Sequence, residues 1–158
     1  MSNSNVVIER KYSARLDELW SLWTTQQGFE SWWGPQGFES KVHSIEPRAG
    51  GILHYDLCAS TPEQVAEMHR MGRPTSHEEW TRYTELTPLK RVSLTTVIDF
   101  VPGVRPYEHT ITADFLREND GIHMTVTLEP MHTAEFTKLT ALGFNSQLSK
   151  LDERFSGT

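Results

Sequence analysis

The chain has 158 residues, with 15 basic and 21 acidic side chains and a formal net charge of −6. This length suits one domain, spanning residues 1–158, with a sizeable apolar core. The acidic balance and the lack of a Lys/Arg cluster argue against nucleic acid as a partner, because phosphate binding requires a basic surface.

The N-terminal third predicts a strand, two short helices and then two further strands. Residues 6–12 are typical of a strand, and the apolar residues within 16–23 follow the spacing of one helix face. A second short helix is predicted over 26–33, where Gly-Pro follows and stops it. Strands are expected at about 38–45 and 51–58.

A third short helix is predicted in the middle of the chain. Thr61-Pro62-Glu63-Gln64 forms a capping box with proline at the first helical position, so a helix should cover 62–71. Its apolar face can serve as a lid over a ligand or as a plug in the core, and the sequence leaves both open. Strands over 77–86 and 92–100 follow.

The C-terminal third predicts a β-hairpin followed by a long helix. Apolar and polar residues alternate over 107–116 and 121–129, and a two-residue loop places both apolar sets on one face. A sheet with one apolar face needs a cover, which the helical pattern over 133–155 supplies. We therefore predict an α+β fold in which a curved sheet grips this helix, and we expect function in a cavity between them.

Gly143 lies in the middle of the predicted long helix. Glycine at such a position costs up to about 1 kcal/mol relative to alanine. Either a strand packs closely against it, or the missing side chain leaves room for a ligand.

Several motifs, taken with this order of elements, resemble a known family. The motifs are Trp32-Trp33-Gly34-Pro35, the segment from Glu46 to Gly51, the segment from Tyr83 to Pro88, and Gly143-Phe144 with Leu148. Together they resemble the START-like (SRPBCC) superfamily and, more narrowly, its branch of homologues of the heat-shock-protein-90 ATPase activator C-terminal domain. Glu46 stands where the family carries Asp.

The resemblance covers nearly the whole chain and implies a helix-grip fold. This fold is an antiparallel sheet of about six or seven strands curled round a C-terminal helix, with two short helices closing one end. Because lipid carriers, hormone receptors and polyketide cyclases share it, the resemblance does not name one activity. The resemblance leaves a homodimer open as an alternative to a monomer.

Polar residues interrupt the inner apolar faces of the predicted elements. Tyr55, Thr96, His109 and Gln147 occupy positions in phase with apolar neighbours. Buried polar groups need partners, which a ligand, trapped water or other protein groups can supply. As a set, these four residues indicate a partly polar cavity.

Both faces of the strand over 77–86 mix bulky and polar residues. Trp80 lies on one face and Tyr83 on the other, and either is a candidate to line the cavity. The alternative is a strand at the rim of the sheet that is half solvated.

Two functions follow from these patterns, and the resemblance implies a third. The first is binding of a small hydrophobic or aromatic ligand, oriented by the polar residues. The second is a cyclase, dehydratase or hydrolase in the same cavity, with His109 or Glu85 as acid or base. The third is a chaperone regulator, ranked lower because the first strand begins by Val6 and we expect no activator domain before it.

Motifs for metals and cofactors are missing from the sequence. The seven histidines form no H-x-x-x-H pair, and the single cysteine excludes paired-cysteine zinc spacing. The sequence has no Gly-rich phosphate loop or dinucleotide fingerprint. We expect no metal and no cofactor.

The sequence predicts a cytoplasmic protein that does not insert into a membrane. Cys58 alone forms no internal disulfide and fits a reducing compartment. The first five residues are unlike a signal peptide, and no apolar run approaches the roughly 20 residues of a membrane span.

Overall fold

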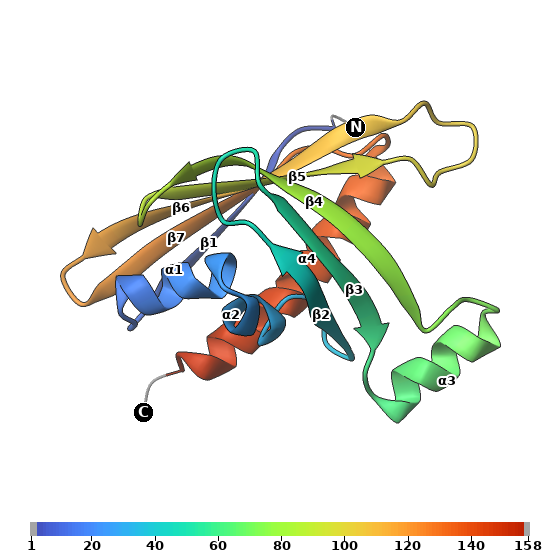
Figure 1. The fold of residues 1–158 in the computed structure, drawn as a ribbon, viewed down its shortest axis with the longest axis horizontal. Coiled ribbons are helices and arrows are strands. Elements are labelled where there is room, and N and C mark those ends of the chain that lie inside the picture. Colours follow the sequence, from blue (N-terminus) through green and yellow to red (C-terminus); the bar gives the residue numbers. More distant parts are fainter. Residues whose placement is uncertain (1–2, 157–158) are drawn as a thin grey trace.

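Seven strands pair into one antiparallel sheet in the computed structural model, which describes residues 3–156. Their order across the sheet is β1-β7-β6-β5-β4-β3-β2, so the first strand lies at one edge beside the last. Figure 1 shows the sheet arching over the helices. In chain order the strands are β1 (Val6–Tyr12), β2 (Phe38–Ile45), β3 (Ile52–Ala59), β4 (Ser76–Thr87), β5 (Arg91–Ile98), β6 (Tyr107–Glu118) and β7 (Gly121–Leu128).

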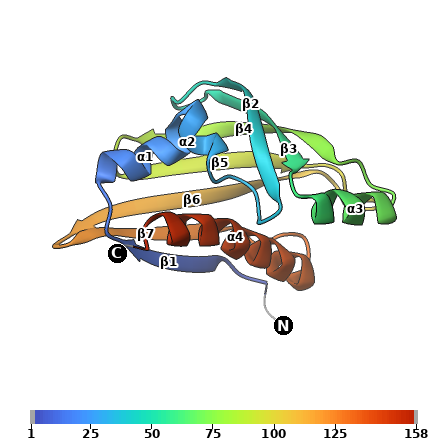
Figure 2. The ribbon, with the colours of Figure 1, turned by 90° about the horizontal axis from the view of Figure 1, so that it is seen from below.

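Three of the four helices described lie on the concave side of this sheet. These are α1 (Leu16–Thr24), α2 (Gln26–Glu30) and the long α4 (Ala134–Arg154). Figure 2 shows α3 (Pro62–Arg70) set apart from them, at the far end of β3 and β4. The predicted α+β fold, a curved sheet around a long C-terminal helix with two short N-terminal helices, is confirmed.

The C-terminal hairpin has the predicted register. Ile111 pairs with Leu128 and Ala113 with Val126, and Asn119-Asp120 form the two-residue loop. The alternation of apolar and polar residues is sufficient to set the register of this hairpin, because a slip by one residue would turn every apolar side chain towards solvent.

Helix α2 is shorter than the sequence predicts. It ends at Glu30 rather than near residue 33, and Ser31 caps it. The chain then turns so that Gly34 adopts φ +115°, and a Cβ at this position would lie 2.9 Å from a methyl carbon of Leu57. The backbone therefore requires glycine here, and the turn delivers the loop over 34–38 to α4.

Aromatic rings fill the end of the concave face beneath α1 and α2. Trp23 is fully buried, with its ring centroid 5.0 Å from that of Trp32 and 5.6 Å from that of Trp33. The Trp33 ring in turn lies 5.8 Å from Phe144 of α4. Burial of such side chains contributes about 1.5–3 kcal/mol each, so this cluster fixes α4 against the short helices.

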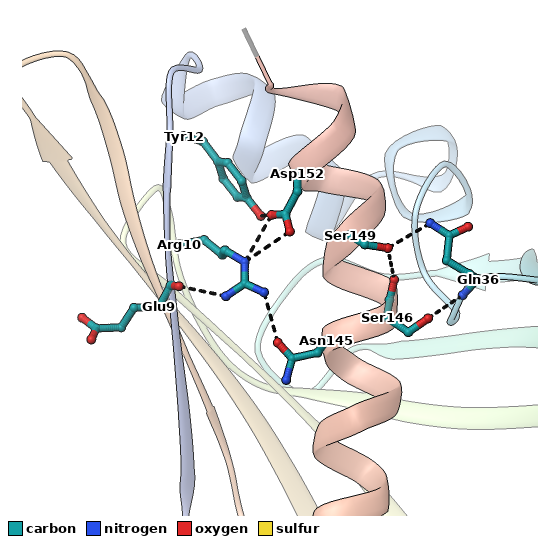
Figure 3. Close-up of polar contacts among 8 residues, drawn as sticks. All are labelled: Glu9, Arg10, Tyr12, Gln36, Asn145, Ser146, Ser149 and Asp152. Carbon is teal, nitrogen blue, oxygen red and sulfur yellow. Dashed lines mark hydrogen bonds and ion pairs between the residues drawn. The ribbon is translucent and has the colours of Figure 1, made fainter.

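Polar contacts join one side of α4 to β1 (Figure 3). The Tyr12 hydroxyl donates to Oδ1 of Asp152 at 2.7 Å, and Arg10 Nε pairs with the same oxygen at 3.2 Å. Arg10 Nη2 also donates to Asn145 Oδ1 at 3.0 Å. The edge strand is thereby attached to the C-terminal half of the helix.

The loop over 34–38 attaches to the other side of α4. Figure 3 shows Gln36 between two serines, with its backbone N–H donating to Ser146 Oγ at 3.0 Å and its Nε2 donating to Ser149 Oγ at 2.9 Å. Lys150 Nζ donates to the Phe38 carbonyl oxygen at 2.8 Å.

Among residues 3–156, no helix is long and apolar enough to cross a membrane.

We predict that Asp152→Ala lowers the free energy of unfolding by about 1–3 kcal/mol, because it leaves the buried Tyr12 and the half-buried Arg10 without their shared acceptor. Urea denaturation measures the change. Glu153→Ala removes the same charge from an exposed neighbouring position and should change stability by less than about 0.5 kcal/mol. Equal effects of both substitutions would contradict this account of how α4 is held.

Candidate functional site

A cavity of about 230 Å³ lies between the concave face of the sheet and α4. Two wider grooves, of about 580 and 780 Å³, lie at the β6–β7 turn, but turn residues and charged side chains line them and neither contains a predicted site residue. The smaller cavity is therefore the candidate site. Its apolar lining includes Phe29, Trp33, Leu53, Leu94, Ile111 and Phe144.

Gln147 supplies a buried donor at the cavity wall. Its side-chain Oε1 accepts a hydrogen bond from the Gly34 backbone N–H at 2.9 Å, which fixes the orientation of the amide. Its Nε2 is then directed away from that contact, and the structure gives it no hydrogen-bond partner within residues 3–156. The residue is only 5% exposed. An unsatisfied buried donor costs about 1–3 kcal/mol, and Gln147 belongs to the cavity lining.

His109 also lines the cavity and carries one acceptor nitrogen. Its Nε2 lies 2.7 Å from the Glu129 carbonyl oxygen, and since a carbonyl only accepts, the ring proton is on Nε2. The other ring nitrogen, Nδ1, then carries a lone pair. Burial lowers the pKa of His109 below its ordinary value, against the opposing influence of Glu129, which favours the neutral ring.

Tyr55 and two threonines add hydroxyl groups. Trp33 Nε1 donates to the Tyr55 hydroxyl oxygen at 3.0 Å, while the hydroxyls of Thr81 and Thr96 are 3.0 Å apart. Burial, followed by the nearby Glu79 carboxylate, raises the pKa of Tyr55 far above its ordinary value. The phenol therefore stays protonated and keeps one O–H to donate.

Gly143 borders open space. Apart from its chain neighbours and the backbone of its own helix, a Cβ built on it would meet no atom within 4 Å among the described residues, so no strand packs closely against the glycine. The residue belongs to the cavity lining together with Thr140 and Phe144 of the same helix.

The cavity brings together five of the predicted site residues, namely Tyr55, Thr96, His109, Gly143 and Gln147. The other three, Trp80, Tyr83 and Glu85, do not line it. Tyr83 is fully buried further along β4, where its hydroxyl donates to the Trp23 carbonyl oxygen at 2.8 Å. Trp80 is 57% exposed and stacks on the His54 ring with centroids 3.6 Å apart. Glu85 is exposed and pairs with Arg91 at 3.7 Å.

Sequence reasoning missed Glu79 and Thr81, which line the cavity from β4. The register Tyr55↔Glu79 places Glu79 directly beside a predicted site residue. This register follows a connection that contains α3, and no turn signal fixes it. The sequence signal that could have identified these two residues is that Glu79 and Thr81 alternate with Trp80 along the strand.

Helix α3 contributes no residue to the cavity lining. Val65 and Met68 are half-buried and Met71 is exposed, so the apolar face of α3 neither fills the core nor covers the site. Within the described part of the chain, no three His, Cys, Asp or Glu side chains gather to hold a metal ion.

A curved antiparallel sheet that grips a long C-terminal helix, with a cavity between the two, defines the helix-grip class of START-like proteins. Within this class, the family model described as activator of Hsp90 ATPase homolog 1-like protein matches residues 13–156. The chain therefore belongs to that family.

Solved structures show the same fold. A Chromobacterium violaceum protein is 20% identical, covering 98% of this chain and 99% of its own, with a TM-score of 0.76. The AHSA1 protein of Silicibacter pomeroyi is 16% identical, covering 97% and 98%, with a TM-score of 0.73. An Arthrobacter aurescens protein is 16% identical, covering 99% and 88%, with a TM-score of 0.74. No functionally curated protein matches the sequence significantly.

We predict that neutral His109 makes stability depend on pH. Its folded pKa lies below the unfolded value of about 6.5, so the unfolded chain binds the proton first on acidification. The stability it contributes is full above about pH 6.5 and is lost as pH falls through the folded pKa. His109→Gln, which keeps a donor for Glu129, should lose less stability than wild type between about pH 7.5 and 5 in urea denaturation.

His77 provides a control of opposite sign. A hydrogen bond to Glu79 raises its pKa, so it contributes stability below about pH 6.5 that is lost as pH rises. His77→Gln should therefore lose more stability than wild type on acidification. Identical pH profiles for wild type and His109→Gln would show that the imidazole is not held neutral by burial.

Proposed function

We propose that this protein binds a small, largely apolar molecule in the cavity between the sheet and α4. The observation that carries the proposal is the Nε2 group of Gln147, a buried donor that Gly34 holds in one orientation and that has no partner within the described chain. Buried polar groups in proteins are nearly always hydrogen-bonded, and a bound molecule would satisfy this one.

The lining and size of the cavity support a small ligand. Stacked Phe29 and Trp33, with centroids 4.7 Å apart, form an aromatic wall, and Leu94 and Ile111 form part of the sheet side. Apolar walls with a few polar groups that set orientation are typical of ligand sites. The 230 Å³ correspond to about eight water molecules at roughly 30 Å³ each, which suits a single ring with a short substituent.

An enzymatic role has weaker support. Of the two predicted acid/base residues, Glu85 lies outside the cavity, and the Nε2 proton of His109 is already engaged by the Glu129 carbonyl. The family description names an ATPase activator, but the cavity itself gives no argument for action on a chaperone. Ligand binding is therefore the function we put to the test.

We predict that Gly143→Leu abolishes binding of acetophenone, a one-ring probe whose carbonyl can accept from Gln147. The leucine side chain would occupy the open space beside Gly143, and affinity should fall at least about tenfold, which corresponds to 1.4 kcal/mol. Titration followed by ¹H–¹⁵N NMR measures the affinity and maps the shifts onto the cavity.

Gly143→Ala is the matched control. It adds only one carbon in open space and should raise helix stability by up to about 1 kcal/mol, while it changes acetophenone affinity by less than about threefold. Unchanged affinity in Gly143→Leu would place the ligand elsewhere, and a lack of binding to wild type at millimolar probe would count against the proposed function.

A further inference from the structure

We infer that the cavity selects an uncharged molecule offering both a hydrogen-bond acceptor and a donor, and that it rejects carboxylates of the same shape. This inference rests on the proposed function and concerns which class of ligand the site accepts. Three features of the lining support it, namely a fixed donor, a fixed acceptor and the negative charge of Glu79, the only ionic side chain of the lining among residues 3–156.

The fixed donor is Gln147 Nε2. An amide side chain can in general rotate to present either its oxygen or its nitrogen, but the Gly34 N–H contact holds Oε1 on the opposite side. Because Gln147 lines the cavity and its Nε2 has no partner among residues 3–156, a ligand that reaches this N–H must meet it with an acceptor such as a carbonyl oxygen. A purely apolar ligand would leave the donor unsatisfied.

The fixed acceptor is His109 Nδ1. The Glu129 carbonyl keeps the proton on Nε2, so the lone pair of Nδ1 is the group left for a ligand. A ligand hydroxyl or N–H can donate to it, whereas a carboxylate cannot. The Tyr55 hydroxyl and the Thr81–Thr96 pair can each rotate a proton, so they adapt to the ligand rather than select it.

The charge of the lining is negative. Glu79 is its only ionic side chain within residues 3–156, and neither Lys nor Arg lines the cavity. A carboxylate entering here would lose its hydration without meeting a cation, which is costly. A cation offers no acceptor for the Gln147 donor, and one Glu79 carboxylate oxygen already lies 3.0 Å from His77 Nε2. An uncharged ligand avoids both penalties.

Four molecules of nearly the same shape separate these possibilities. Benzamide is neutral with an acceptor and a donor, benzoate is an anion, benzamidinium is a cation, and 2-phenylpropene is apolar. At pH 8, where His109 is neutral, wild type should bind benzamide at least about tenfold tighter than each of the others. Benzoate or benzamidinium binding as tightly as benzamide would overturn the inference, and so would 2-phenylpropene.

Variants assign the selectivity to individual groups. Glu79→Gln should raise benzoate affinity at least about threefold while benzamide affinity stays within about twofold. Glu78→Gln is the matched control, because Glu78 is exposed and pairs with His54 at 2.8 Å outside the cavity lining; it should change neither affinity. Gln147→Met should weaken benzamide about tenfold and should not weaken 2-phenylpropene, because the apolar probe no longer leaves a donor unsatisfied.

The panel separates failure of the inference from failure of the proposed function. If none of the four probes nor acetophenone binds wild type, or if all still bind Gly143→Leu, the cavity is not a ligand site and the inference falls with it. If the probes bind and Gly143→Leu abolishes binding, but benzoate equals benzamide, ligand binding stands and the selection of neutral molecules is wrong. The comparison on wild type holds even if a variant fails to fold.

Discussion

The hydrogen bond from the Gly34 N–H to Gln147 Oε1 is the contact on which the site depends. It joins the turn after α2 to the C-terminal half of α4 and holds the Gln147 amide in one orientation. Gly34 can make this contact because its backbone adopts a positive φ that other residues avoid. One backbone position thus fixes the orientation of a side-chain amide in the cavity lining.

The cavity persists because α4 is held by polar contacts as well as by packing. Asp152 binds β1 on one side and Ser146 binds the loop over 34–38 on the other, while Trp33 packs on Phe144. These contacts lie from Phe144 onward, whereas Gly143 borders open space. Because the helix is fixed at these points, it does not have to collapse onto the sheet to be stable, and buried polar groups can face an unfilled volume.

Local patterns predicted the architecture and part of the site. Alternation and a two-residue loop suffice for the β6–β7 hairpin, and the same phase places His109 on the inner face. The position of β4 could not be predicted in this way, because α3 precedes it and its pairing with β5 shifts register between Tyr83 and Glu85. The sequence therefore left Trp80 and Tyr83 as alternative candidates on opposite faces, and Glu79 was missed. The fixed orientation of Gln147 depends on a contact 113 residues away in sequence, which no local pattern contains.

A crystal structure of the protein grown with benzamide tests the central claim most directly. The account predicts the ring between the sheet and α4, with the benzamide oxygen about 2.7–3.2 Å from Gln147 Nε2 and its amide N–H directed at His109 Nδ1. Benzamide bound elsewhere, with Gln147 Nε2 satisfied by a protein group and the space beside Gly143 closed, would contradict it.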